Sequence, residues 1–307
     1  MNTILFNENG RLRSGWRAGI FLVTFLFLSI IFIFGSMGLL SMLPFGPSAG
    51  SYLPLVIPFA VSSAIAIILG GLYGKLFEGL PLRALGISFR GNWLSNFAFG
   101  CMVGSVAFVT AIIIAVMAGG MNLSVNRDSG TSAIFTTLLT TLVIFFVGAL
   151  SEETLFRGYF LQTLLRSNQL VLGVGMTSLL FALAHDNNPA IGKLSLLNTF
   201  LAGCWFAAGY LKTRELWFPL GMHLMWNWLQ GPVLGINVSG IAEFSPDPVL
   251  RLTDAGPAWL TGGSYGIEGG VVCTFALVLS MVMIYFMPRP KADDEMLIMS
   301  NTESNKL

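Results

Sequence analysis

The sequence predicts an all-α protein, a polytopic bundle of about eight transmembrane helices, and two observations carry that prediction. First, 54% of the 307 residues are hydrophobic and only 10% are charged, whereas a soluble domain carries about 25% charged residues. Second, long uncharged stretches recur along the chain, and roughly 20 apolar residues are enough to cross a bilayer. Because lipid removes the need for a charged surface, a membrane domain accounts for both observations.

Eight apolar stretches are the predicted spans: residues 18–43, 52–74, 94–119, 132–150, 170–184, 194–211, 216–234 and 270–287. The stretch 44–51 is rich in Pro, Gly and Ser and is typical of a turn between the first two spans. The first stretch is too long for the apolar region of a signal peptide, and no small-residue cleavage site follows it, so we expect it to be retained as a span.

Basic residues predict the orientation, because cytoplasmic loops are enriched in Lys and Arg. With eight spans, 13 of the 16 Lys and Arg residues fall on one side, and only Arg127, Lys193 and Arg251 fall on the other. Both termini are therefore expected in the cytoplasm, as tails at 1–17 and 288–307 that flank a single transmembrane domain at 18–287. The catalytic core is expected at about 132–234 and an extracytoplasmic loop at about 230–269.

Charge and cysteine content restrict the possible partners and cofactors. The net charge of +1 gives no sign of a nucleic-acid partner. Cys101, Cys204 and Cys273 are odd in number and all lie in apolar stretches. They are interpreted as buried thiols, and neither a disulfide framework nor a metal site is expected from them. Nothing in the sequence indicates an oligomeric state.

Ionisable groups at membrane depth are costly, so each one is a candidate for a functional site. Three clusters contain such groups, and both histidines of the chain belong to them. The clusters are Glu152, Glu153 and Arg157 at the end of the fourth predicted span, Phe181 and His185 at the end of the fifth, and His223 and Asn227 inside the seventh.

The spacing within each cluster predicts which side chains share a helix face, because residues four apart lie on the same face. Glu153 can pair with Arg157, and Glu152, rotated by about 100°, can face a cavity. A desolvated carboxylate can take a proton from water. Imidazole and amide N–H groups can stabilise an oxyanion. Together these are the parts of a hydrolytic site.

Each group also has a structural interpretation. Glu153 and Arg157 are by themselves more typical of a structural ion pair, and Asn227 is by itself more typical of an interhelical hydrogen bond. Glu152 or a single histidine at a span end can be an interfacial residue. The occurrence of all these groups in one chain favours the catalytic interpretation.

At these residues the sequence resembles the CPBP family, the CAAX protease and bacteriocin-processing family that includes the type II CAAX prenyl endopeptidases. The family motifs EExxxR, FxxxH and HxxxN match, in order and on separate helices, Glu152, Glu153 and Arg157, then Phe181 and His185, then His223 and Asn227. The match covers about 132–227, and the long loop at 230–269 is similar to that of bacterial members.

The resemblance implies a multi-pass endopeptidase of the cell inner membrane, acting on membrane-associated proteins or peptides. By position, Glu152 would activate water, and His185 would help to hold that water. His223 and Asn227 would stabilise the oxyanion, and Glu153 and Arg157 would support the site. No cofactor is favoured. The alternative is a zinc enzyme with Glu152, His185 and His223 as ligands, since catalytic zinc usually has three protein ligands.

Two other classes of function stay open from the sequence. One is a non-catalytic membrane protein that binds a peptide or confers bacteriocin immunity. The other is a proton-coupled transporter, although no inverted repeat is visible.

The predicted span limits place Glu152 and His185 at opposite membrane surfaces. A shared site therefore requires that some limits move or that the short helices do not cross fully.

Overall fold

The computed structural model describes residues 4–7, 10–42 and 52–301, so the predicted turn at 44–51 lies outside the described residues. Most of the described chain is helical, as predicted. The helices are α1 (Ser14–Ser41), α2 (Leu53–Tyr73), α3 (Trp93–Met117), α4 (Thr131–Leu155), α5 (Leu161–Arg166), α6 (Leu170–Ala184), α7 (Lys193–Thr213), α8 (Trp217–Trp228), α9 (Ala258–Thr261), α10 (Val271–Phe286) and α11 (Asp294–Ser300).

Apolar helices dominate the bundle. Among the described residues, 5 helices are long and apolar enough to cross a membrane: Ser14–Ser41, Leu53–Glu78, Trp93–Met117, Thr131–Arg166 and Lys193–Thr213. Helices α6 and α10 are apolar but shorter, and α8 has only 12 residues before a π-helical turn at Leu229–Val233. A helical membrane bundle accounts for this composition, and the number of crossings stays a prediction.

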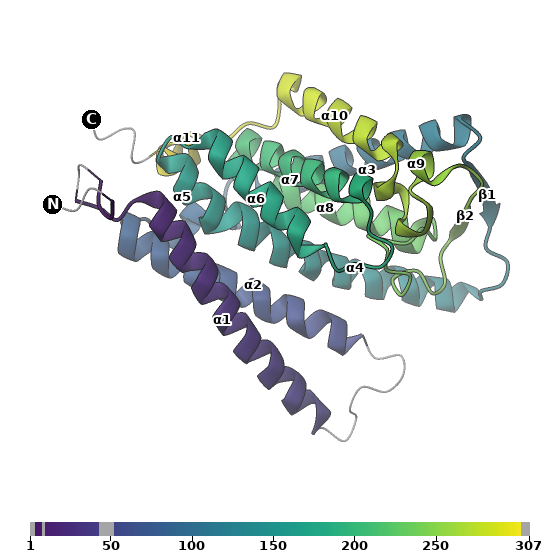
Figure 1. The fold of residues 1–307 in the computed structure, drawn as a ribbon, viewed down its shortest axis with the longest axis horizontal. Coiled ribbons are helices and arrows are strands. Elements are labelled where there is room, and N and C mark those ends of the chain that lie inside the picture. Colours follow the sequence, from purple (N-terminus) through teal and green to yellow (C-terminus); the bar gives the residue numbers. More distant parts are fainter. Residues whose placement is uncertain (1–3, 8–9, 43–51, 302–307) are drawn as a thin grey trace.

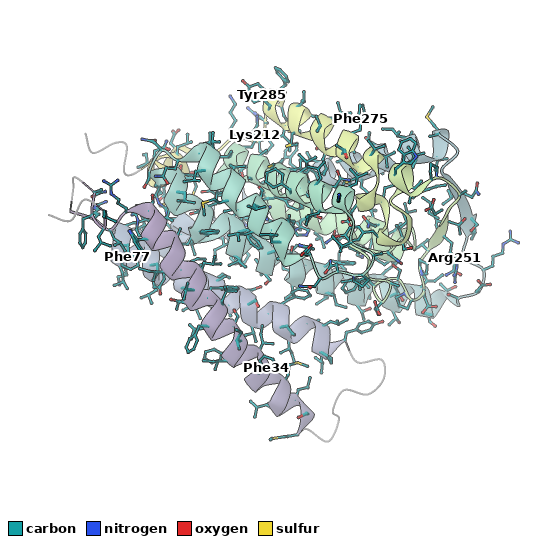
Figure 2. The ribbon with its side chains drawn as sticks, in the orientation of Figure 1. Phe34, Phe77, Lys212, Arg251, Phe275 and Tyr285 are labelled. Atoms are coloured by element: carbon teal, nitrogen blue, oxygen red, sulfur yellow. The ribbon has the colours of Figure 1, made fainter. Side chains whose placement is uncertain are left out.

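The outer surface of the bundle is suited to lipid. Large apolar side chains point outward from several helices, and Phe34, Phe275 and Tyr285 are 74%, 56% and 79% exposed (Figure 2). So many exposed large apolar side chains are unusual for a soluble monomer. It is the surface that a bilayer covers without cost.

The fourth predicted span is longer than expected. Helix α4 runs to Leu155 and continues through a π-helical turn, Phe156–Phe160, into α5, so that one apolar helix of 36 residues extends from Thr131 to Arg166. The bend is at Gly158, where ψ is −134°. Such π-helical turns are often found at functional sites. The first polar cluster therefore lies inside a helix, and its predicted position at a span end is wrong.

The loop predicted at about 230–269 contains regular structure. It forms strand β2 (Leu250–Asp254), which pairs antiparallel with β1 (Met121–Val125), so Met121 lies opposite Asp254. This small sheet was not predicted. Figure 1 shows the sheet at one end of the bundle and the start of α1 and helix α11 at the other, while α1 and α2 diverge from the remaining helices.

Helices α3 and α8 approach each other closely because three glycines line their contact. A Cβ atom at Gly100 would lie 2.1 Å from the carbonyl oxygen of Phe218, one at Gly104 would lie 2.4 Å from that of Met222, and one at Gly221 would lie 2.4 Å from that of Phe97. Small residues at helix contacts in membranes allow this approach of backbones. The glycines therefore determine where α8 lies.

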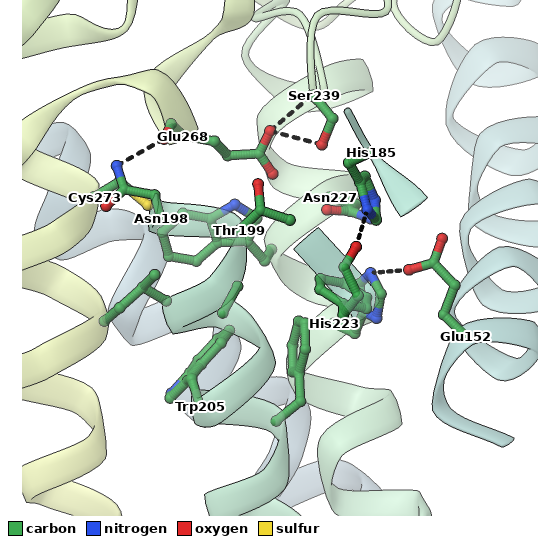
Figure 3. A pocket seen from close by; sticks show the side chains of 15 residues that line it. Glu152, His185, Asn198, Thr199, Trp205, His223, Asn227, Ser239, Glu268 and Cys273 are labelled. Carbon is green, nitrogen blue, oxygen red and sulfur yellow. Dashed lines mark hydrogen bonds and ion pairs between the residues drawn. The ribbon is translucent and has the colours of Figure 1, made fainter. Parts of the chain in front are cut away.

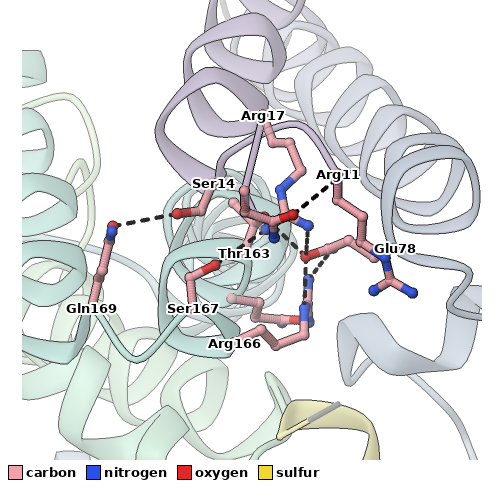
Figure 4. A network of polar contacts seen from close by, with 10 residues as sticks. Arg11, Ser14, Arg17, Glu78, Thr163, Arg166, Ser167 and Gln169 are labelled. Atoms are coloured by element: carbon pink, nitrogen blue, oxygen red, sulfur yellow. Dashed lines mark hydrogen bonds and ion pairs between the residues drawn. The ribbon is translucent and has the colours of Figure 1, made fainter. Parts of the chain in front are cut away.

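A buried polar network fixes α1 against the end of α2 and against α5 (Figure 4). Glu78 accepts hydrogen bonds from Arg17 at 3.0 Å and from Arg166 at 2.6 Å, and Thr163 donates to the same carboxylate at 3.0 Å. All the charged side chains of this network are nearly fully buried. Charge-assisted hydrogen bonds at low dielectric are strong, so this network joins three segments at one end of the bundle.

The α3–α8 contact yields a prediction. The substitution Gly104→Ala should lower the free energy of unfolding by about 1–3 kcal/mol, because an added methyl group overpacks a backbone contact that cannot yield. Thermal unfolding in detergent measures the effect.

Gly19→Ala is the matched control, because Gly19 is exposed on α1 and a methyl group added there would have no atom within 4 Å. It should leave stability unchanged or raise it slightly. Equal effects of the two substitutions would show that the glycine contact does not position α8.

Candidate active site

The structure brings the predicted catalytic side chains together. Glu152 on α4, His185 directly after α6, and His223 and Asn227 on α8 all line two adjoining cavities. The larger cavity has a volume of about 330 Å³ and the smaller about 70 Å³. Figure 3 shows these four side chains around the smaller cavity. Their convergence is established by the fold, whereas their catalytic roles stay predictions.

The two helix lengths explain how Glu152 and His185 reach the same depth. Glu152 lies about four helical turns before the end of α5 at Arg166. The chain then reverses, and α6 has 15 residues, or about four turns, before His185. Helix α6 therefore ends beside Glu152 inside the bundle, and the two residues do not lie at opposite surfaces.

The Glu152 carboxylate faces the cavities. Its side chain is 24% exposed, and its Oε2 atom lies 3.6 Å from Nε2 of His223. Among the described residues, this buried oxygen has no hydrogen-bonding partner. A buried oxygen without a partner is costly unless a water or ligand satisfies it, so the geometry favours a water bound at Glu152.

His223 is held in one orientation. Its Nδ1 atom donates to Oε1 of Glu153 over 3.0 Å, since an ionised carboxylate can only accept. Its ring stacks on Phe206 with centroids 4.4 Å apart and an angle of 19° between the planes. These contacts leave Nε2 directed toward Glu152, because the hydrogen bond made by one ring nitrogen sets the orientation and the tautomer of the other.

The predicted pair of Glu153 and Arg157 is present and fully buried, with 3.1 Å between the charged atoms. Arg157 also donates to the carbonyl oxygen of Gly203 on α7 at 2.9 Å and lies over the ring of Phe181 at 4.7 Å. Because Oε1 of Glu153 also accepts from His223, this carboxylate connects the cavity to α4, α7 and α8. Its support of the site stays a prediction, and its contact with His223 is one that the sequence did not predict.

His185 is fixed in a single tautomer when neutral. Its Nδ1 atom lies 2.8 Å from the carbonyl oxygen of Phe181, and a carbonyl can only accept, so Nδ1 carries the proton. Nε2 is then an acceptor. The predicted packing of Phe181 beside the imidazole is confirmed, with ring centroids 4.8 Å apart.

Two residues of the loop reach the smaller cavity and were missed from the sequence. Glu268 and Ser239 line it together with the predicted set. Burial raises the pKa of Glu268, although Ser239 donates to its carboxylate. The only sequence signal was an acid in a glycine-rich stretch just before the last apolar segment, and this pattern is equally typical of an interfacial residue.

In the described part of the chain, no three His, Cys, Asp or Glu side chains are grouped in a way that could hold a metal ion, and the choice between the glutamate and zinc mechanisms stays a prediction. The three cysteines are unpaired, as predicted, but only Cys273 is fully buried.

Arg157 lies within the bundle, so its predicted position among the cytoplasmic charges is wrong.

Comparison with known proteins agrees with this site. Residues 134–229 match the family model described as type II CAAX prenyl endopeptidase Rce1-like. An uncharacterized 24.3 kDa protein of Escherichia coli is 37% identical over 90 residues, which are 28% of this chain and 40% of that protein. The match thus spans less than half of that relative. All four cavity side chains therefore lie within the segment that is similar to the Rce1-like type II CAAX prenyl endopeptidases, and this similarity implies a peptidase.

Proposed function

We propose that the protein is a glutamate-dependent endopeptidase of the cell inner membrane that hydrolyses peptide bonds of membrane-associated proteins or peptides. The observation that carries the proposal is the buried Oε2 atom of Glu152, which has no partner among the described residues and lies at the cavity 3.6 Å from His223. A binding protein does not need this carboxylate beside two oriented imidazoles, and the sequence has no inverted repeat that would favour a transporter.

The geometry supports the following order of events. A water bound between Glu152 and Nε2 of His185 loses a proton to Glu152 and attacks the carbonyl carbon of the peptide. Asn227 and the Nε2 atom of His223 stabilise the oxyanion that forms, the latter when it carries a proton. Collapse of the intermediate breaks the C–N bond, and Glu152 returns the proton to the leaving amine.

The walls of the larger cavity indicate how a substrate in the membrane enters. Phe59 of α2, Ile144, Phe145 and Gly148 of α4, and Phe244 of the loop line it together with the catalytic set. These walls are mostly apolar and extend to α2, which diverges from the bundle with α1 (Figure 1). An apolar segment can therefore contact Glu152 without leaving an apolar environment.

The first prediction concerns catalysis. Glu152→Gln should reduce cleavage of a membrane peptide by purified protein by about 10²–10⁴-fold, because the amide cannot take a proton. His223→Ala and Asn227→Ala should each cost about 10²–10³-fold, as expected for oxyanion donors. Mass spectrometry of the products measures the rate.

Glu243→Gln is the control, since Glu243 is an exposed acid of the loop, and it should keep full activity. A Glu152→Gln protein that keeps its biological effect would favour the binding or immunity function. Zinc bound at about one ion per chain, and lost together with activity on chelation, would contradict the glutamate mechanism.

The second prediction concerns the Glu153 carboxylate. Glu153→Gln should lower the free energy of unfolding by about 3–5 kcal/mol, because it leaves Arg157 buried without a counter-charge. Activity should also fall, since His223 loses its orienting acceptor. Glu295→Gln breaks a pair with Arg83 in which the side chains are 57% and 46% exposed, and exposed pairs contribute about 0–1 kcal/mol. If the two variants unfold at the same temperature, Glu153 does not hold the site together.

The third prediction concerns topology, for which we propose eight crossings with both termini in the cytoplasm. Arg17 and Arg166 lie at the end of the bundle that carries α11 (Figures 1 and 4), and Arg251 lies at the opposite end (Figure 2). This distribution agrees with the proposed orientation, because the positive-inside rule places most basic residues on the cytoplasmic side. Reporter fusions at the N-terminus, after Lys212 and after Met287 should indicate cytoplasm, and one at Ser239 the far side. A far-side signal after Met287 would show an odd number of crossings.

A further inference from the structure

The smaller cavity extends past the catalytic set to a carboxylate that the mechanism does not use. Glu268, in a 3₁₀ turn at Ile267–Gly269, lines the cavity at the end away from Glu152 (Figure 3). Its backbone oxygen accepts a hydrogen bond from the Asn198 side chain on α7 at 2.8 Å. The carboxylate is therefore part of a built wall and does not belong to a mobile surface.

Ser239 binds one oxygen of the carboxylate, and Gln230 and His185 also interact with the carboxylate. Oε2 of Glu268 accepts from the backbone N–H of Ser239 at 2.6 Å and from its hydroxyl at 3.0 Å. Figure 3 shows the other carboxylate oxygen directed into the cavity. Among the residues that the structure describes, no Lys or Arg forms an ion pair with Glu268.

A carboxylate held away from water is costly without a cation. Burial raises the pKa of Glu268, although Ser239, Gln230 and the charge of His185 act in the opposite direction. These groups of the protein therefore do not fully offset the cost of burial. A cationic group that enters the cavity would supply a further counter-charge, because an opposite charge at hydrogen-bond distance favours the ionised carboxylate.

The rest of the cavity wall fits an alkyl chain. The lining of the smaller cavity also includes the side chains of Trp205, Trp226 and Leu277, which are largely apolar. A lysine side chain matches this lining, because it has an apolar stem that packs on hydrophobic surface and a charged tip. Its compact ammonium suits a space of about 70 Å³ better than the planar guanidinium of arginine.

We propose that the smaller cavity is a side-chain subsite in which Glu268 binds the ammonium group of a substrate lysine. This inference rests on the proposed function, because a lysine subsite has a meaning only if the peptide bond to be cleaved lies at Glu152. The lysine would then lie near that bond in the substrate. Ser239 and Asn198 act as positioning residues that hold Glu268 in the cavity wall.

The test separates binding from cleavage. A fluorescent leucine–alanine peptide carries a single lysine that is moved along its length, and a second series carries norleucine, which has the stem without the charge. Affinities are measured with the Glu152→Gln protein in nanodiscs of phosphatidylcholine, which has no net charge. At one position lysine should bind about 10- to 100-fold more tightly than norleucine, the range of a charged hydrogen bond. The added substitution Glu268→Gln should remove this difference and leave the norleucine affinity unchanged.

Three outcomes are informative. If lysine and norleucine bind equally at every position, the subsite is absent, and this result needs no variant at position 268. If Glu268→Gln in the active protein lowers kcat equally for both series, the carboxylate acts through the neighbouring His185, and the subsite proposal is wrong. If lysine is preferred in binding but no peptide is cleaved by the active protein, the subsite stands and the proposed peptidase function fails.

Discussion

The carboxylate of Glu153 is the constraint on which the site depends. It is fully buried, pairs with Arg157 and accepts a hydrogen bond from His223. Two charges and an imidazole so far from water are tolerated only when each has several partners. Arg157 meets this condition through the Gly203 carbonyl and the aromatic faces around it. The result is a rigid connection among α4, α7 and α8, and it holds the imidazole at the cavity.

The site also depends on how deeply each element enters the bundle. Helix α6 is short and ends at His185 inside the protein, while α4 continues past Glu152 through a π-helical turn. The glycines between α3 and α8 bring His223 to the same level. A hydrolytic site in a membrane needs water at this depth, and polar groups that converge on a cavity between helices provide it without exposing backbone to lipid.

The two carboxylates of the cavities have different surroundings, and different roles are proposed for them. Glu152 faces the imidazole of His223, where a proton can be taken up and returned. Glu268 is held by Ser239 at the other end of the smaller cavity. Separate environments for two acids are a common way to divide chemistry from recognition within one site. The loop at about 230–269 supplies the second acid, so the loop belongs to the site and is more than a connection.

The sequence by itself determined the helical membrane class, because too few charges were present to cover a soluble surface. It also identified Glu152, His185, His223 and Asn227, since ionisable groups in apolar helices are rare and their spacing defines helix faces. Only the tertiary structure decided that these groups meet, because depth depends on where helices end and how they pack. Helix α4 continues past its predicted limit at 150, and α6, which keeps its predicted limits of 170–184, ends inside the bundle. The tertiary structure alone revealed Glu268, because a loop acid has no periodic pattern that predicts where the chain folds it.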